Sequence, residues 1–175
     1  MNRVDTPVAN RDRRPSWAAR FEPLESRLML SADNFAVLFS GGFDAENNYA
    51  RYYENTRDLY NVLVDECGVA PENVWVLFSD GGDPGLDQSV VQGGGTVLQD
   101  SDMSFVQGVD RTYSATAANL QTVFSSVAAE AEQEDRFLFW TFDHGSGSKD
   151  PAIAGEEQLV GWNEFIDDDQ LAAML

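Results

Sequence analysis

Three uninterrupted, largely apolar runs constrain what this chain of 175 residues can fold into. They are Phe35–Phe39, Val74–Phe78 and Phe137–Phe142, and small or polar residues follow each of them. A strand with one solvent-exposed face alternates apolar and polar residues, whereas a strand covered on both faces does not. The runs therefore predict strands of a parallel sheet, with Phe137–Phe142 at its centre.

Two amphipathic segments separate these strands. The first, from Asn47 to Cys67, predicts a helix with an inward stripe, and so does a second segment that Ser114 can cap. The first stripe is Tyr52, Thr56, Leu59, Leu63 and Cys67, and the second is Leu120, Val123, Phe124, Val127, Ala128 and Ala131. Strands alternating with helices indicate right-handed crossovers. We therefore expect an α/β fold of three layers, a mainly parallel sheet with helices on both faces and strand order 2-1-3.

The predicted topology points to a site at the carboxyl ends of the first and third strands. Ligands of open α/β sheets bind where the strand order reverses, and the loops that meet there are Ser40–Gly42 and Asp143–Gly145. His144 lies in the second loop and is the only histidine in the chain. An imidazole placed there can act as a general acid or base, or can simply cap the strand through a carbonyl. The neighbouring residues favour the catalytic role.

The remaining segments predict smaller elements. Val90–Val91 and Thr96–Leu98 flank three glycines as a hairpin would, Gly145–Ser148 is expected to be a mobile loop, and Gln158–Val160 an extended piece. A helix should begin at Asp167, with Leu171 and Leu175 on one side. So short a helix cannot complete its own burial. We therefore expect residues 35–175 to be a domain that is incomplete at its C-terminus. Residues 1–34, which precede this domain, are expected to be a leader.

An acidic loop follows the second strand. Asp80, Asp83 and Asp87 could hold a hard cation through oxygen ligands, but their spacing fits no EF-hand loop. Solvated acidic loops are common in so acidic a protein, so we favour that interpretation. No metal and no cofactor is predicted.

Charge limits the partners. The net charge is −19, and the residues after position 30 carry five basic and 26 acidic side chains. Such a surface repels phosphate backbones and anionic lipids, and no apolar run is long enough to span a membrane. Cys67 is the single cysteine, and its place on the first helical stripe predicts core packing instead of nucleophilic chemistry.

Four segments together resemble the legumain-like cysteine peptidases, which share the caspase-like fold with caspases and gingipains. They are a first strand ending in a small-residue turn, Asn47–Tyr52 at the start of the first helix, Gly68–Val74 before the second strand, and an apolar strand ending in Asp143-His144-Gly145. The last of these is the most specific, and the resemblance runs from Phe35 to Leu175. It implies a cysteine endopeptidase that acts on protein or peptide substrates.

The resemblance also implies roles for individual residues. His144 would protonate the leaving amine, and the N–H of Gly145 would stabilise the oxyanion. Asp143 matches the residue that precedes the family's histidine. Arg51 matches the arginine that lines the family's specificity pocket, which would favour an acidic or amide side chain at the cleavage position. Asn48 lies one residue away from the asparagine that orients the histidine. The family's nucleophilic cysteine follows a fourth strand, which this sequence does not reach, so the chain by itself should be inactive.

The N-terminal segment carries a second resemblance. Pro23–Asp33 is similar to the "LEPR…LLSA" segment at the start of many large extracytoplasmic proteins of certain aquatic bacteria. This implies export, whereas a disordered leader with a chance match is the alternative.

Two other functions compete with a peptidase. One is a caspase-like module that binds without catalysis. The other is a response-regulator domain, which also gathers acids at the carboxyl ends of parallel strands. The second would need an acidic pair after the first strand and a lysine after a later one, but Ser40–Gly42 follows the first strand here.

Overall fold

The computed structural model describes residues 32–147 and 157–175, and within it Ala32–Leu175 forms one compact unit. Residues 1–31 of the predicted leader and residues 148–156 therefore lie outside the described residues, whereas Asn34, the last predicted leader residue, is the first residue of a strand. None of the helices in the described part is long and apolar enough to cross a membrane.

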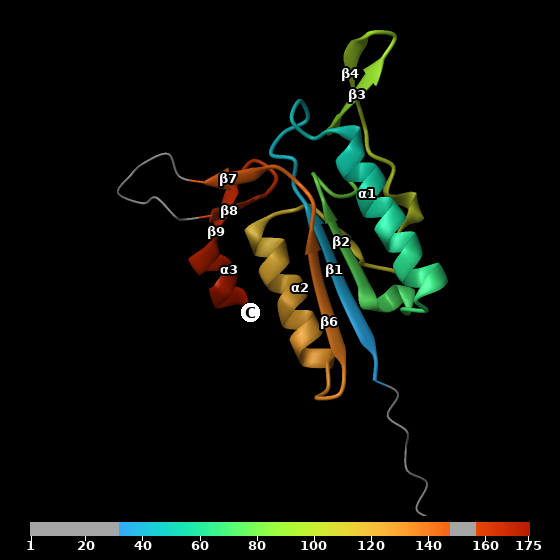
Figure 1. Ribbon diagram of the computed structural model, residues 1–175, viewed down its shortest axis with the longest axis vertical. Helices are drawn as coiled ribbons and strands as arrows, with labels where there is room; N and C mark the ends of the chain where they lie inside the picture. Colours follow the sequence, from blue (N-terminus) through green and yellow to red (C-terminus); the bar gives the residue numbers. More distant parts are fainter. Residues whose placement is uncertain (1–31, 148–156) are drawn as a thin grey trace, which may run out of the picture. The chain divides into compact units, whose positions relative to one another are not determined.

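The fold is built on a parallel sheet of four strands (Figure 1). The strands are β1 (Asn34–Ser40), β2 (Val74–Phe78), β5 (Thr112–Tyr113) and β6 (Arg136–Thr141), in the order β5-β2-β1-β6. In the register of the sheet, Val37 of β1 lies opposite Trp75 of β2 and Phe139 of β6. The predicted order of the three main strands is thus confirmed, with the short β5 added outside β2.

Helices cover both faces of this sheet (Figure 1). Side chains of β1 alternate between the faces: Phe35, Val37 and Phe39 join the core under α2 (Ala117–Glu130), whereas Ala36 and Leu38 join the core under α1 (Ala50–Asn61). Both sets are fully or almost fully buried. Burial on both faces explains why β1 is apolar without alternation.

The prediction that Phe137–Phe142 is the central strand was wrong. In the described residues β6 pairs with β1 alone and lies at the edge of the sheet. Phe137, Leu138 and Phe142 are 43%, 40% and 39% exposed. An apolar run signals a preference for burial, but it does not reveal whether a neighbouring strand is present.

The first helix differs from its prediction at both ends. It begins at Ala50 and not Asn47, because the Asp44 carboxylate accepts the N–H groups of Glu46 and Asn47 and holds this segment in a turn. At its other end it continues into a π-helical turn, Val62–Glu66, in which the Cys67 N–H donates to the Val62 carbonyl at 2.9 Å.

The predicted core position of Cys67 was also wrong, because its side chain is exposed. A π turn closes five residues back instead of four. It therefore shifts the phase of the apolar stripe, so that Leu63 is buried but Cys67 is not.

The second helix largely matches its prediction. Leu120, Val123, Phe124 and Val127 are buried, whereas Ala128 and Ala131 are exposed and do not belong to the inward face. Thr116, not Ser114, is the N-cap, and its hydroxyl accepts the N–H of Asn119. The Ser114 hydroxyl accepts instead from the Asn119 side chain.

Smaller elements complete the unit. The predicted hairpin is β3 (Gln88–Gln92) with β4 (Gly95–Gln99), and the predicted extended piece is β8 (Glu157–Val160). Helix α3 (Asp168–Met174) begins one residue later than expected, because Asp167 is its N-cap. The predicted mobile loop is a strand over its described part, because β7 (Gly145–Gly147) pairs with β8, which also pairs with β9 (Phe165–Asp167). Short 3-10 turns lie at Pro71–Asn73 and Met103–Phe105.

Candidate functional site

The predicted site forms where the carboxyl ends of β1 and β6 meet. β1 ends at Ser40 and continues into Gly41–Gly42, and β6 is followed by Phe142, Asp143 and His144. The two strands are parallel neighbours, so both loops leave the sheet at the same edge. The structure therefore brings together the two loops that the sequence predicted.

Asp143 fastens the two loops to each other. One of its carboxylate oxygens accepts the Gly42 N–H at 2.5 Å, and the other accepts the N–H of His144 at 2.6 Å. The Ser40 hydroxyl lies 3.3 Å from the same carboxylate and 2.9 Å from the Phe142 carbonyl, to which it donates at the shorter distance. Burial raises the pKa of Asp143, although these hydrogen bonds oppose the rise. This carboxylate thus points toward the β1 turn and positions the residue that follows it.

The His144 ring is held by a backbone carbonyl. Its Nε2 lies 2.9 Å from the carbonyl oxygen of Asn47. A carbonyl can only accept a hydrogen bond, so Nε2 carries the proton in this contact. In the neutral ring the lone pair then belongs to Nδ1, which is the nitrogen available as a base.

Two tyrosines flank the same ring. The centroids of Tyr49 and Tyr52 lie 5.3 and 5.2 Å from that of His144, both in edge-to-face arrangements. Such contacts are favourable between aromatic rings and restrict their rotation. The imidazole is therefore oriented by three partners, all of them between Asn47 and Tyr52.

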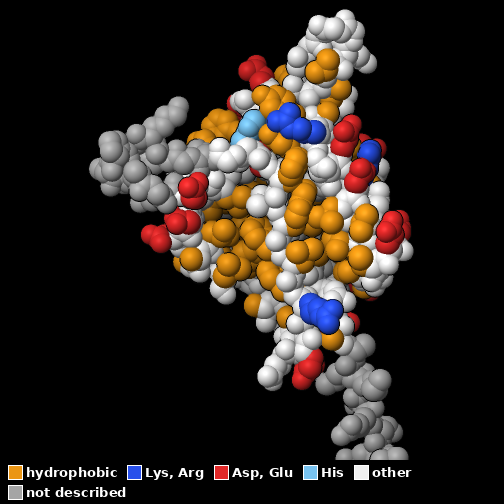
Figure 2. Space-filling model, viewed as in Figure 1, with side chains coloured by type: hydrophobic (Ala, Val, Ile, Leu, Met, Phe, Trp, Pro, Cys, Tyr) orange, Lys and Arg blue, Asp and Glu red, His pale blue; other side chains and the backbone are white. Residues whose placement is uncertain are grey.

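Arg51 lies beside this aromatic group. Its guanidinium stacks on Tyr49 and Tyr52, 4.4 and 4.8 Å from their ring centroids, and donates to the Tyr52 hydroxyl at 3.0 Å. The side chain is exposed, and no carboxylate of the described residues lies within ion-pair distance of it. Figure 2 shows the histidine and a basic side chain close together on one face. The site thus offers an oriented cation that lacks a counter-charge in the described structure.

Gly145 follows the histidine and begins β7, where it lies opposite Leu159. It is exposed, and a Cβ added to it would meet no heavy atom within 4 Å. The backbone next to His144 is therefore open to an approaching ligand.

Asn48 has a different place from the one its predicted role requires. It is fully buried, and its side-chain amide donates to the Asp87 carbonyl at 2.7 Å, while its own carbonyl accepts the Ser89 N–H at 2.7 Å. The contact that orients His144 comes from the backbone of Asn47. Sequence reasoning missed this residue because any residue type can supply a backbone carbonyl.

The three acids of the loop after β2 do not form a metal-binding group. Among the described residues, no set of three or more histidine, cysteine, aspartate or glutamate side chains is placed to hold a metal ion. Asp87 is fully buried, and its carboxylate accepts both the N–H and the hydroxyl of Ser101. Desolvation, together with the charge of Asp87 nearby, raises the pKa of Asp80 to about 7.

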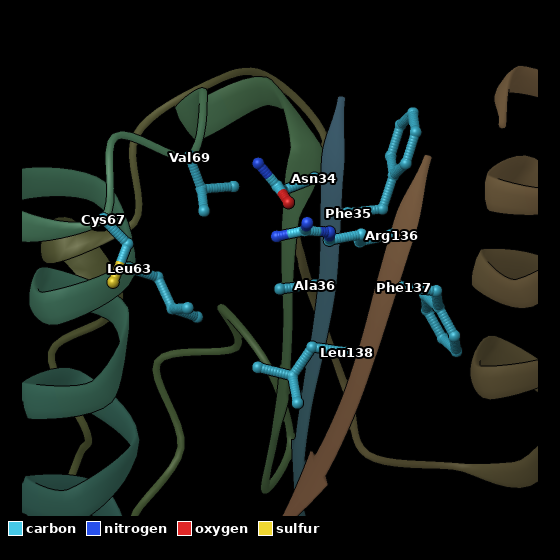
Figure 3. A pocket seen from close by; sticks show the side chains of 9 residues that line it. All are labelled: Asn34, Phe35, Ala36, Leu63, Cys67, Val69, Arg136, Phe137 and Leu138. Carbon is cyan, nitrogen blue, oxygen red and sulfur yellow. The ribbon is translucent and has the colours of Figure 1, made fainter. Parts of the chain in front are cut away.

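Cys67 lies far from His144 along the strands. It lines a pocket of about 340 Å³ together with Asn34, Leu63 and Arg136 (Figure 3). Asn34 and Arg136 are the first residues of β1 and β6, so this pocket is at the amino ends of the strands. The only thiol of the chain therefore cannot meet the imidazole.

Fold and site together define an α/β protein with a polar site at the carboxyl edge of a parallel sheet. Comparison of the sequence with protein-family models found no match, and comparison with curated proteins found none either.

Proposed function

We propose that this chain is the first part of a legumain-like cysteine endopeptidase with a caspase-like fold. The observation that carries the proposal is the orientation of His144: the Asn47 carbonyl holds Nε2–H, which leaves Nδ1 as the basic nitrogen at the carboxyl edge of the sheet. An imidazole fixed in one tautomer at such an edge is suited to general acid–base catalysis.

The nucleophile would come from polypeptide that pairs with β6. Among the described strands only β1 pairs with β6, and Phe137 and Leu138 of β6, with Phe142 just after it, are each about two-fifths exposed, which supports such pairing. Figure 2 shows hydrophobic side chains gathered over the middle of this face, where β6 runs in Figure 1. A parallel strand added there would end close to His144, and a thiol at its end would be in reach of the imidazole.

The proposed reaction then runs in two steps. The thiolate adds to the peptide carbonyl, the Gly145 N–H stabilises the oxyanion, and His144 gives a proton to the leaving amine as the C–N bond breaks. Water, deprotonated by the same imidazole, then cleaves the thioester and releases the acid and the thiol. No cofactor is needed.

Arg51 is the proposed contact for the substrate side chain at the cleavage position. Its guanidinium is stacked on two tyrosines and has no carboxylate partner among the residues that the structure describes, so it is suited to a carboxylate or an amide oxygen. The strongly acidic composition disfavours nucleic acid as a partner. We also propose that the protein is exported, on the N-terminal resemblance alone.

Activity assays on two proteins test the proposal. The first is this chain, and the second is the chain extended through the coding sequence that follows Leu175. Fluorogenic peptides with aspartate or asparagine before the scissile bond should be cleaved by the longer protein only. Iodoacetamide and His144→Ala should each abolish cleavage, whereas Cys67→Ser should not.

A longer protein that folds, binds such peptides and lacks a cysteine after its next strand would support a non-catalytic binding module instead. Cleavage by the 175-residue chain itself would contradict the proposed origin of the nucleophile.

A further inference from the structure

The β3–β4 hairpin extends beyond the amino-terminal end of α1 (Figure 1). Its residues, Gln88–Gln99, include no charged side chain, although the chain has a net charge of −19. Exposed edge strands usually carry charges or prolines that discourage pairing with another chain. The β3–β4 hairpin contains neither a charged residue nor a proline.

The geometry of the turn shows which backbone groups face outward. Gly93 and Gly94 both have positive φ, 60° and 86°, and form a two-residue turn closed by Gln92 opposite Gly95. The closing pair of such a turn exchanges both of its hydrogen bonds, and every second pair along the ladder does the same. Ser89 and Val91 therefore point their N–H and C=O groups away from β4.

Observed contacts agree with this assignment. The Ser89 N–H donates outward to the Asn48 carbonyl at 2.7 Å, and Tyr49 forms a parallel bridge with Ser89. The chain then enters α1 at Ala50 and leaves this edge. Val91 is the next outward-facing residue of β3, and its side chain is 82% exposed.

No described residue pairs with the outer edge of β3 at Val91, and this edge adjoins the candidate site. Tyr49, which pairs with Ser89, also contacts the rings of His144 and Tyr52 and carries the Arg51 guanidinium on its face. An extended polypeptide that leaves Arg51 can therefore reach β3 directly.

We propose that the outer edge of β3 at Val91 is a subsite for an extended segment of the polypeptide whose side chain contacts Arg51; this rests on the proposed function. The N–H and C=O of Val91 supply backbone hydrogen bonds, as in strand addition to a sheet edge. Val91 and Leu98 lie on the same face of the hairpin and accept an uncharged, apolar side chain.

The size and charge of the edge favour this occupant over a second copy of the chain. Strands of five residues bury much less than the roughly 1,200 Å² typical of a stable interface. Two copies with a net charge of −19 each would also repel one another. A polypeptide that is already bound at Arg51 has a high effective concentration at β3, so a few more hydrogen bonds are enough for it to pair with this strand.

Fluorescence anisotropy with two labelled peptides tests the subsite on the chain as it stands. One probe is Gly-Asp-Gly with blocked ends, and the other has Thr-Val-Thr added on both sides. The longer peptide should bind about tenfold more tightly, as two ordinary hydrogen bonds allow. Val91→Pro removes the outward N–H at a position where an edge strand tolerates proline, and it should abolish this advantage.

Control variants show whether the tighter binding of the longer peptide depends on the Val91 N–H, on the apolar face of the hairpin or on Arg51. Val91→Thr keeps the N–H and should retain the advantage, as should Val109→Lys at a residue that is 83% exposed outside the hairpin. Leu98→Lys, on the proposed face, should reduce it. Arg51→Ala should weaken both peptides.

Equal affinity of the two peptides, or an advantage that survives Val91→Pro, would overturn the subsite while leaving the proposed function intact. Failure of both peptides to bind would count against both. A dimer in sedimentation velocity that Val91→Pro dissociates would assign the edge to a second copy and overturn the proposal.

Discussion

Gly41→Ala tests how closely the turn after β1 is packed. A Cβ at Gly41 would lie 2.5 Å from Gly161 Cα and from the Val160 carbonyl oxygen, and closer still to the carbonyl carbon of Gly161. Non-bonded carbon atoms prefer separations of about 3.5–4 Å. All three neighbours are backbone atoms, so no side-chain rotation can relieve the overlap.

The opposing segment cannot easily move away. Trp162 donates its N–H to the Ala115 carbonyl at 2.8 Å, and Asn163 donates to the Phe43 carbonyl at 2.6 Å. Overpacking typically costs about 1–3 kcal/mol, and this site should lie at the upper end. A loss of about 3 kcal/mol corresponds to a melting temperature lower by roughly 6–12 °C in a domain of this size, or a urea midpoint lower by about 1.5 M.

Urea titration followed by tryptophan fluorescence measures the effect, with Gly82→Ala as the matched control. Gly82 has no neighbour within 4 Å of an added Cβ and its φ is not positive, so alanine there should stabilise by about 0.4–1 kcal/mol through the unfolded state. The two substitutions should therefore have opposite signs. A Gly41→Ala protein within about 1 kcal/mol of wild type would refute the packing argument.

Three further predictions concern single side chains. The pKa of Asp80 is about 7 in the folded protein and has its ordinary value of 3.8 in the unfolded chain, so the proton on Asp80 contributes its full stabilisation below about pH 4, and this contribution is lost as the pH rises through about 7. The free energy of unfolding of Asp80→Asn, measured by urea titration, should therefore equal that of wild type near pH 4 and exceed it at pH 8. The same difference between the two proteins at both pH values would contradict this prediction. In Asp143→Asn, a single side-chain oxygen remains to accept the two N–H groups of Gly42 and His144, so hydrogen exchange of one of these amides should accelerate. The matched Asp135→Asn should accelerate exchange only at Asp33 and Glu132. Unchanged exchange at Gly42 and His144 in Asp143→Asn would show that Asp143 does not hold the two loops together. Exposed Cys67 should react with iodoacetamide in the native protein without loss of stability, and protection from the reagent would show that it is buried.

Local patterns determined the elements and their order. Runs without alternation marked β1 and β2, glycines marked the hairpin turn, and the alternation of strands and helices implied the neighbours of β1. Because parallel strands end at one edge, the chain order also implied that Ser40–Gly42 would meet Asp143–Gly145, as the structure shows.

Only the tertiary structure decided what surrounds each residue. The exposed position of Cys67 follows from a π turn, and the edge position of β6 follows from which strands pair; neither leaves a pattern in the composition of a segment. Every residue type provides a backbone carbonyl like that of Asn47, and every type except proline provides an N–H like the outward one of Val91, so no residue pattern marks either group. Their roles arise from spatial neighbours, which is why the sequence could predict His144 as a candidate but not the contacts that orient it.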